Sequence, residues 1–239
     1  MRKRIEPLSR FLVTTTVSKH RVFAWLRSPT LPDHQLVAFA RDDDYFFGVL
    51  HSRLHEIWGL KLGTRLETRP RYTPTTCFET FPLPQPTTEQ EAAIAAAAKE
   101  LNTLRERWLN PPEWTVEKVL EFSGSVNGPW ARYVVKPDKN GIGTVRYPRL
   151  EPKDAEYAKK LEDRTLTKLY NERPMWLDLA HKKLDAAVAA AYGFPADLTD
   201  EQILERLLKL NLERAAAELK TGQTKKPKTT RAKRDDEML

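Results

Sequence analysis

The sequence predicts a mainly helical α+β fold, with a small sheet-containing N-terminal part followed by a helical C-terminal region. Short runs rich in branched and aromatic residues occupy the first forty residues, as is typical of strands. Later stretches place apolar residues at helical steps. Two alternating runs flank Asn140-Gly141 within the helical region, which predicts one β-hairpin insertion. A basic tail with almost no apolar residues ends the chain.

Residues 1–41 are predicted to form the sheet-containing part. Ser, Pro and Asp residues, which favour turns, separate its three predicted strands. The strands are residues 11–18, 21–26 and 35–40. The connection between the first two carries Lys19, His20 and Arg21, which suit phosphate contacts but are equally typical of a solvent-facing turn.

Residues 42–86 combine a predicted helix with a basic loop and a proline-rich exit. The helix opens after the aspartates of residues 42–44 and ends near Gly63. Its apolar face consists of Phe47, Leu50, Leu54, Ile57 and Trp58. The loop holds few apolar anchors, so its guanidinium groups are expected to point outward; its notable residues are Arg65, Arg69, Arg71 and Tyr72. Guanidinium suits phosphate and the guanine edge, although a solvated basic loop has the same composition.

Residues 87–219 are predicted to be helical apart from the hairpin. A first helix covers residues 87–109, where Thr88 and Glu91 match a capping box. Its apolar seam consists of Ile94, Ala97, Leu101, Leu104 and Trp108. The seam could bind another chain, but packing against the later helices in an internal bundle is favoured.

Two further helices complete this region. One covers residues 175–192 and ends at Gly193, and the other runs from residue 200 to about residue 219. Thr199 and Gln202 match a capping box at the start of the second. This last helix is predicted to be mostly buried because of Ile203, Leu204, Leu207, Leu208 and Leu210.

The hairpin is predicted at about residues 130–150. Gly141 and Gly143 are interpreted as turn glycines, because a nucleotide-binding loop requires a preceding parallel strand and a following helix. Basic residues of this hairpin suit a contact with a nucleic-acid backbone or an ordinary solvated face. They are Arg132, Lys136, Lys139 and Arg146.

The net charge of +7 favours anionic partners, but much of it is local. Residues 220–239 contain seven Lys or Arg against three acids, a net +4 that leaves +3 for the rest of the chain. This tail is predicted to be disordered. The single cysteine, Cys77, excludes an internal disulfide and is expected to be a packed side chain in a reducing compartment. Without an apolar run of eighteen residues, the protein is expected in the cytoplasm, associated with the nucleoid and not with a membrane.

Two long segments resemble parts of class I S-adenosylmethionine-dependent DNA methyltransferases, especially the MmeI-like restriction and modification proteins. The first, FGVLHSRLHEIWGLKLGTRLETRPRYTPTTCFETFPLP, resembles the segment that follows the target-recognition domain. The second, RTLTKLYNERPMWLDLAHKKLDAAVAAAYGFP with LTDEQILERLLKLNLERA after it, is similar to the helical C-terminal region of that family. In these proteins, the region corresponding to residues 1–41 ends the recognition domain.

The resemblance implies adenine-specific DNA methylation, with target recognition and chemistry on one long chain. The methyltransferase core and its cofactor site have no counterpart in this sequence, so no cofactor is expected here and S-adenosylmethionine is expected on the missing catalytic domain. A split-gene subunit, a truncated remnant and a coding-region fragment are all consistent with this departure.

Catalytic motifs within the chain are weak. Residues 110–113 read Asn-Pro-Pro-Glu, whereas amino-methyltransferases need an aromatic fourth residue to stack on the flipped base. The motif is therefore interpreted as a helix C-terminus. His51 and His55 are four residues apart but lack the metalloprotease glutamate after the first histidine, and they are predicted to lie at the surface.

The sequence thus favours a DNA target-recognition and C-terminal module of an adenine-specific methyltransferase, not catalytic by itself. Its partners would be double-stranded DNA and a catalytic domain or subunit. Glu67 is a candidate acceptor for the cytosine amine, or the partner of a surface ion pair. The candidate DNA-binding residues are Lys19, His20, Arg21, Lys61, Arg65, Glu67, Arg69, Arg71 and Tyr72. Alternatives are a helical interaction protein without DNA binding and a minimal methyltransferase that uses residues 110–113.

Overall fold

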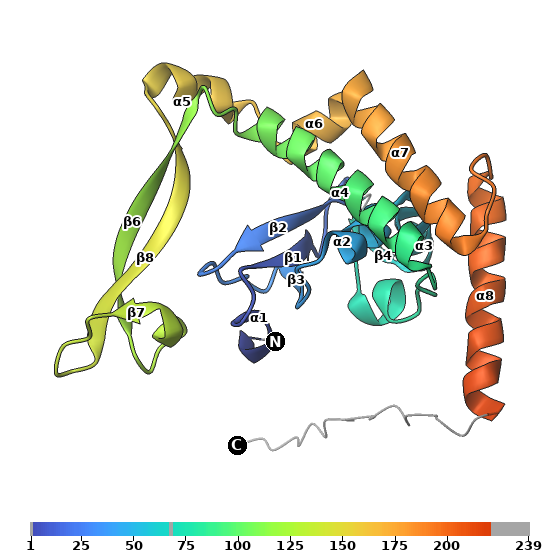
Figure 1. Cartoon of the computed structure of the whole chain (residues 1–239), viewed down its shortest axis with the longest axis horizontal. Helices are drawn as coiled ribbons and strands as arrows, with labels where there is room; N and C mark the ends of the chain where they lie inside the picture. Colours follow the sequence, from blue (N-terminus) through green and yellow to red (C-terminus); the bar gives the residue numbers. More distant parts are fainter. Residues whose placement is uncertain (1, 67–68, 221–239) are drawn as a thin grey trace, which may run out of the picture.

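A computed structural model describes residues 2–66 and 69–220 of the chain (Figure 1). The short helix α1 (Arg2–Ile5) leads into a three-stranded antiparallel sheet with the order β2-β1-β3. Its strands are β1 (Arg10–Thr15), β2 (Phe23–Arg27) and β3 (Leu36–Phe39). All three predicted strands are confirmed, and Leu12 in the central strand pairs with Trp25 on one side and Phe39 on the other.

Two consecutive helices follow the sheet in place of the single helix predicted. Asp43 caps α2 (Asp44–His51) by accepting a hydrogen bond from the backbone of Phe46. Ser52, in an extended conformation, separates α2 from α3 (Arg53–Leu62). Gly63 ends α3, as predicted, and the chain continues into the hairpin β4 (Thr64–Leu66) and β5 (Arg69–Arg71) and the π-helical turn η1 (Pro74–Phe78).

The helical region consists of α4 (Thr88–Leu109), α6 (Leu166–Glu172), α7 (Met175–Tyr192) and α8 (Asp200–Lys220). The capping box of α4 is formed by Thr87 and Gln90, one residue earlier than predicted. The box of α8, formed by Thr199 and Gln202, is confirmed. Burial of α8 was overestimated, because Leu208 is 51% exposed while Ile203 and Leu207 face the core.

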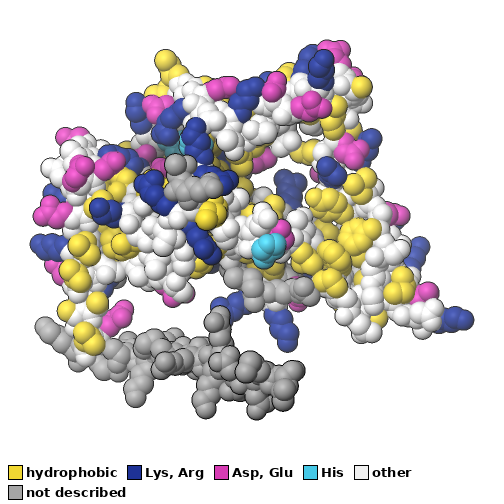
Figure 2. Space-filling model, turned by 180° about the vertical axis from the view of Figure 1, so that it is seen from behind, with side chains coloured by type: hydrophobic (Ala, Val, Ile, Leu, Met, Phe, Trp, Pro, Cys, Tyr) yellow, Lys and Arg dark blue, Asp and Glu magenta, His cyan; other side chains and the backbone are white. Residues whose placement is uncertain are grey.

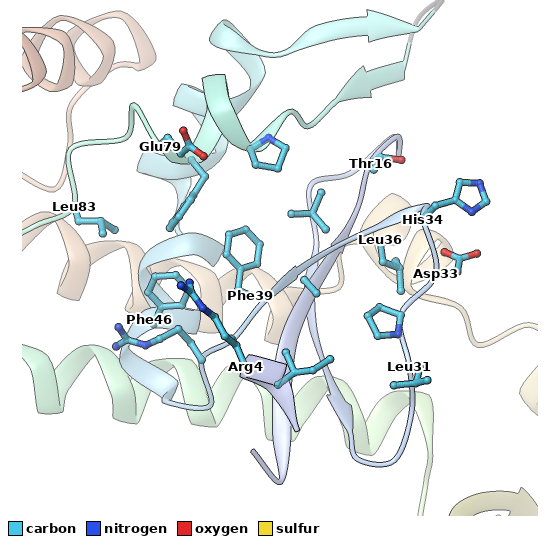
Figure 3. Close-up of a pocket in the computed structure, with 18 residues that line it drawn as sticks. Arg4, Thr16, Leu31, Asp33, His34, Leu36, Phe39, Phe46, Glu79 and Leu83 are labelled. Carbon is cyan, nitrogen blue, oxygen red and sulfur yellow. The ribbon is translucent and has the colours of Figure 1, made fainter. Parts of the chain in front are cut away.

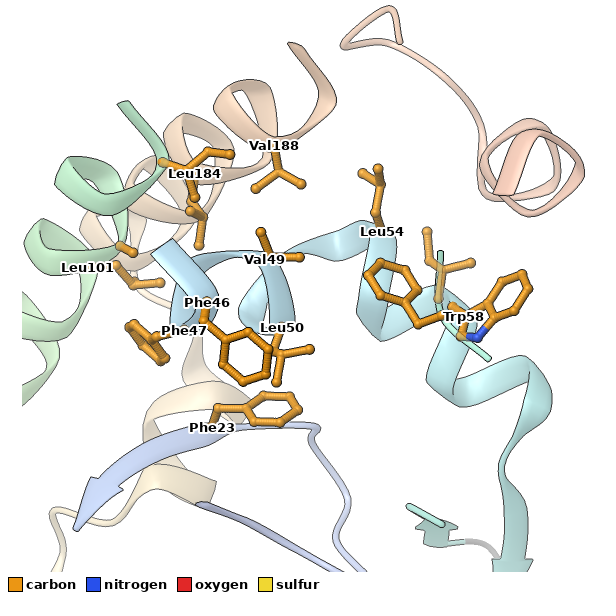
Figure 4. Close-up of a cluster of buried hydrophobic side chains, with 14 of the residues drawn as sticks. Phe23, Phe46, Phe47, Val49, Leu50, Leu54, Trp58, Leu101, Leu184 and Val188 are labelled. Carbon is orange, nitrogen blue, oxygen red and sulfur yellow. The ribbon is translucent and has the colours of Figure 1, made fainter. Parts of the chain in front are cut away.

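The hydrophobic core joins the sheet to the helices (Figure 4). Helix α2 lies between them, with Phe47 and Leu50 near Phe23 of β2 and with Leu101 of α4 and Leu184 of α7 beyond it. The apolar seam of α4 is thus used inside the molecule, as predicted for an internal bundle. The helices approach closely at Gly48, where a Cβ would lie only 2.8 Å from Ile94 Cγ2 and 2.9 Å from Ala98 Cβ.

A long antiparallel arm projects beside this body (Figure 1). Strands β6 (Thr115–Ser125) and β8 (Ile142–Pro152) pair along their whole length, and β7 (Val134–Val135) adds a short third strand after the 3-10 turn η2 (Ala131–Tyr133). The predicted turn is confirmed by Gly141, which has a φ of +75° and donates to Asp138 O at 2.9 Å. The hairpin nevertheless begins at Thr115, well before the predicted residue 130.

The arm is attached to the body at its root and near its tip. At the root, α5 (Ala155–Glu162) follows β8, and Arg164 donates to Trp108 O at 2.6 Å while its Cζ lies 4.2 Å from the Trp114 ring centroid. Near the tip, Trp130 Nε1 donates to Pro29 O at 3.0 Å, and Arg132 donates to Glu6 O. Between these attachments the arm exposes large apolar side chains, including Val119 at 57%.

The mainly helical α+β class is therefore confirmed. Residues 221–239, most of the tail that was predicted to be disordered, lie outside the described residues. Among the described residues, no helix combines the length and the apolar character that a membrane span requires.

Candidate nucleic-acid interface

The β4–β5 hairpin presents three arginines at the surface. Arg65 pairs with Pro70 across the hairpin, and Arg71 pairs with Thr64. Arg65, Arg69 and Arg71 are all exposed, as their predicted outward orientation requires. A hairpin this short and polar cannot hold its position through its own burial, so its placement depends on the neighbouring loop.

That neighbouring loop is the connection between β1 and β2. Tyr72 N donates to Thr16 O at 2.7 Å, and Ser18 N donates to Pro70 O at 3.3 Å. Val17 and Arg71 form a β-bridge between the two segments. The hairpin, a separate two-stranded sheet, is thereby bound to the β1–β2 loop, and its arginines lie beside that loop, which carries Lys19.

Two predicted DNA contacts, Arg21 and Tyr72, are wrong because both side chains are buried. Arg21 is 7% exposed, and its guanidinium donates to Thr14 Oγ1 at 3.0 Å, to Thr15 O and to Pro70 O at 3.4 Å. Its Cζ lies 4.9 Å from the ring centroid of Tyr72, which is 2% exposed. Burial lowers the pKa of Arg21 and raises that of Tyr72. These residues support the surface from beneath and do not reach a ligand on it.

Lys19 and His20 lie on the surface and share one partner, Asn171 in α6. Lys19 Nζ donates to Asn171 Oδ1 at 2.5 Å, and His20 Nε2 lies 2.8 Å from the same oxygen. Sequence reasoning did not single out Asn171, because no pattern links residues about 150 positions apart. The loop is therefore tied both to the basic hairpin and to the helical region.

The remaining candidates are Lys61 and Glu67. Lys61, in the last turn of α3, is exposed. Glu67 lies outside the described residues, so its predicted contact with a base stays a prediction. Figure 2 shows the molecule from behind, relative to Figure 1. Lys and Arg side chains gather on one part of this face.

A buried polar network lies beneath this surface. His51 Nδ1 accepts from Phe23 N at 3.2 Å, and its Nε2 lies 2.8 Å from the Tyr170 hydroxyl, which lies 3.1 Å from His181 Nε2. His55 repeats the arrangement, with Nδ1 at 2.8 Å from Leu50 O and Nε2 at 3.1 Å from the Tyr72 hydroxyl. The prediction that His51 and His55 lie at the surface is wrong, since they are 5% and 0% exposed.

The network keeps its histidines neutral. Burial, followed by the Arg105 guanidinium, holds the pKa of His51 well below its ordinary value. Burial likewise lowers the pKa of His55 to about 4, and burial with nearby Arg173 lowers that of His181 to about 4. Arg105 is fully buried beside them, 3.2 Å from His51 Nε2 through Nη1, and donates from Nη2 to Asn102 Oδ1 at 3.1 Å.

The part of the chain that carries the basic surface matches a known protein family. Residues 2–85 match the family model described as "MmeI, target recognition domain". We refer to this matched part as the MmeI-like target recognition region. It contains the first sheet, α2, α3 and the hairpin with Arg65, Arg69 and Arg71.

Two longer proteins resemble the chain beyond this region. DNA methyltransferase A of Bacillus subtilis (strain 168) is 29% identical over 171 residues, which cover 71% of this chain and 13% of that protein. A solved structure of the Type IIL restriction-modification enzyme MmeI in complex with DNA matches with a TM-score of 0.60 and 21% identity. That match covers 88% of this chain and 22% of the MmeI chain, so this chain spans a small part of both relatives.

The MmeI-like target recognition region also contains a hollow, separate from the basic hairpin (Figure 3). It has a volume of about 1480 Å³ and follows the outer edge of β3, with Phe39 and Phe46 in its lining. Arg4, Asp33 and Glu79 lie on separate sides of it (Figure 3). Its polar groups therefore do not converge on a common point, as an active site requires.

The candidate motif of residues 110–113 lies outside the MmeI-like target recognition region. Asn110 is the C-cap of α4, and the carbonyl of Glu113 accepts from Lys153 Nζ at 2.9 Å. The interpretation as a helix C-terminus is confirmed. Cys77 is fully buried, as predicted, and the described residues contain no group of three or more His, Cys, Asp or Glu that could hold a metal ion.

Proposed function

We propose that this chain is the target-recognition and C-terminal part of a DNA methyltransferase of a restriction-modification system. The observation that carries the proposal is the coincidence of two features in residues 2–85: the MmeI family match and an exposed basic hairpin bound to the β1–β2 loop. The similarity to a DNA methyltransferase of B. subtilis and to an enzyme solved with DNA supports duplex DNA as the ligand.

The chemistry of each side chain suggests which part of the DNA it would contact. Arg65, Arg69 and Arg71 would enter a groove, because guanidinium can donate two hydrogen bonds to guanine or contact phosphate. Lys19 and Lys61 would neutralise phosphates as point charges. Glu67, between the arginines in sequence, would accept from a cytosine amine.

Catalysis would reside in a domain or subunit other than the residues described here. That partner would bind S-adenosylmethionine and transfer its methyl group to an adenine of the target, while this chain positions the duplex. The protein would act in the cytoplasm, where the nucleoid supplies its substrate.

Binding of duplex DNA by the purified full chain across a salt series tests the proposal. Changing Arg65, Arg69 and Arg71 together to alanine should lower the affinity and reduce the slope of log K against log salt by about 2–3. A matched triple variant, with the exposed Lys99, Lys183 and Lys209 changed to alanine, removes the same charge from α4, α7 and α8.

The two variants distinguish an effect of charge at the hairpin from an effect of the total charge of the protein. If wild type binds and only the hairpin variant loses affinity, the proposal holds. Absence of DNA binding, or equal losses in both variants, would contradict it. A further deletion of residues 221–239, which hold six Lys or Arg against three acids, shows whether the basic tail accounts for the binding.

A further inference from the structure

The turn between α6 and α7 lies next to the basic surface through a continuous chain of contacts. The β4–β5 hairpin bonds to the β1–β2 loop through Tyr72 N to Thr16 O and Ser18 N to Pro70 O. The same loop then contacts Asn171 through Lys19 and His20. Residues near 18, 70 and 171 therefore form one surface, although the last belongs to the helical region.

The contacts of Asn171 orient its amide. Its Oδ1 accepts from Lys19 Nζ and faces His20 Nε2, so that its acceptor is occupied within the protein. The amide nitrogen, Nδ2, makes no hydrogen bond with the described residues, and the residue is exposed. Asn171 therefore offers two N–H donors to solvent and no free acceptor.

Arg173 adds a cation two residues further on. It ends α6 with φ 41° and ψ 62°, a left-handed conformation that a residue with a Cβ rarely adopts. Its Nε pairs with Asp178 at 3.0 Å, and its two terminal nitrogens have no hydrogen-bond partner among the described residues. Asp178 is also paired with Lys182 at 2.9 Å, so one carboxylate is shared between two cations.

We infer that Lys19, Asn171 and Arg173 form a phosphate-contact site, which binds the DNA backbone beside the duplex segment that the β4–β5 hairpin reads. This inference rests on the proposed function and extends its surface into the helical region. A backbone phosphate accepts from all three donor types and makes no demand for an acceptor. Reading adenine would require the Asn171 oxygen as well as its nitrogen, and that oxygen is occupied.

Arg173→Gly tests the site with little risk to the fold, because glycine readily adopts the left-handed conformation found there. DNA binding by the full-length variant should weaken about 3- to 10-fold at low salt, and the salt slope should fall by about one. The loss should be the same for two duplexes of unrelated sequence, because phosphate contacts carry no sequence information. Lys209→Ala, which removes an exposed cation from α8, is the matched control.

Asn171→Ala provides a second, uncharged test. It should weaken binding to both duplexes while the salt slope stays near the wild-type value, since no charge is removed. Thermal unfolding should show that both variants retain the folded state.

The outcomes distinguish this inference from the proposed function. If wild type binds DNA but both variants keep its affinity and slope, the phosphate site is excluded and the recognition function stands. If the variants weaken binding to one duplex and not to the other, the residues read bases and the inference is wrong. If wild type binds no DNA, both the function and the site are overturned.

Discussion

Cations occur in two adjacent regions of this molecule, one exposed and one buried, and the two regions use them differently. Lys19, Arg65 and Arg71 are exposed at the surface of the β1–β2 loop and the β4–β5 hairpin. Arg21 and Arg105 lie beneath, where they are 7% and 0% exposed. Residue type alone therefore does not identify a ligand contact, because Arg21 is two residues from Lys19 and faces the opposite way.

Burial dictates what each region can do. A buried polar group must find a partner inside the protein, and the Arg21 guanidinium does so with Thr14, Thr15 and Pro70. An exposed cation stays hydrated until it neutralises a DNA phosphate. That contact releases the counterions condensed on the DNA. Changes in the buried region should therefore appear in stability, and changes at the surface should appear in DNA affinity.

The largest expected effect lies at Phe23, where the buried region meets the core. Phe23 is fully buried among Phe39, His51, His55 and Tyr72. Phe23→Ala should lower the free energy of unfolding by about 3–5 kcal/mol in chemical denaturation, through lost burial and the cavity left behind. Val119→Ala on the exposed arm is the control and should change it by less than about 1 kcal/mol. Similar losses in both would contradict the assigned burial.

Acidification should destabilise the buried region next most strongly. His55 and His181 have a pKa of about 4 in the folded protein against 6.5 when unfolded, so the unfolded state binds their protons first. Stability is therefore lost as the pH falls from about 6.5 to about 4, by on the order of 3 kcal/mol per histidine. Asp185, whose pKa burial raises from 3.8 to about 6, contributes with the opposite sign in the same range and offsets part of this loss.

His181→Gln isolates one of these contributions, because glutamine does not titrate and can still form a hydrogen bond with the Tyr170 hydroxyl. Thermal unfolding between pH 7 and pH 4.5 should show a smaller decrease of Tm in the variant than in wild type. Parallel pH profiles would mean that His181 does not titrate as its burial requires.

An intermediate effect is expected for Arg21, which is buried under the β1–β2 loop, compared with Arg71, which is exposed on the neighbouring hairpin. Arg21→Ala leaves buried oxygens without a donor and should cost about 1–3 kcal/mol of unfolding free energy. Arg71→Ala should leave Tm almost unchanged and weaken DNA binding. Equilibrium unfolding and a DNA titration on both variants check this, and a reversal of the two results would remove the distinction between the regions.

The smallest effect is expected for an exposed pair outside both regions. Arg146 and Glu121 form an ion pair on the arm at 2.9 Å, with side chains 70% and 52% exposed. Glu121→Ala should change the free energy of unfolding by less than about 1 kcal/mol, because water and salt screen such pairs. It should also leave DNA affinity within about twofold of wild type, which would show that exposure of charge alone does not define the DNA surface. A change of affinity well beyond twofold in either direction would place the arm within that surface, because Glu121→Ala removes a negative charge and releases Arg146.

Sequence patterns predicted the elements that are set by neighbouring residues, such as helix caps and turns. Asp43 caps α2, Gly193 ends α7 in the left-handed conformation, and the Asp138–Gly141 turn forms in the arm. The full length of the arm was missed because β6 exposes side chains on both faces, so its residues lack the alternation that marks a half-buried strand.

Long-range contacts account for the errors at the site. The helical spacing of His51 and His55 was visible, but their burial depends on Tyr170 and Tyr72, which approach from other elements. The outward orientation of the hairpin arginines followed from the lack of apolar neighbours. Nothing local indicated that Arg21 turns inward or that Asn171 meets Lys19, because both depend on how distant segments pack.

The two attachments of the arm have a mechanical consequence. Root and tip are both fixed to the body, so the arm, α4 and the first sheet close into a frame (Figure 1). α4, with 22 residues, makes one side of that frame about 33 Å long. While the bonds from Trp130 and Arg132 to the body persist, the arm does not swing independently of the first sheet. A force applied at Trp108, in the last turn of α4, reaches Pro29, beside the sheet, by a second path along the strands of the arm as well as through the core.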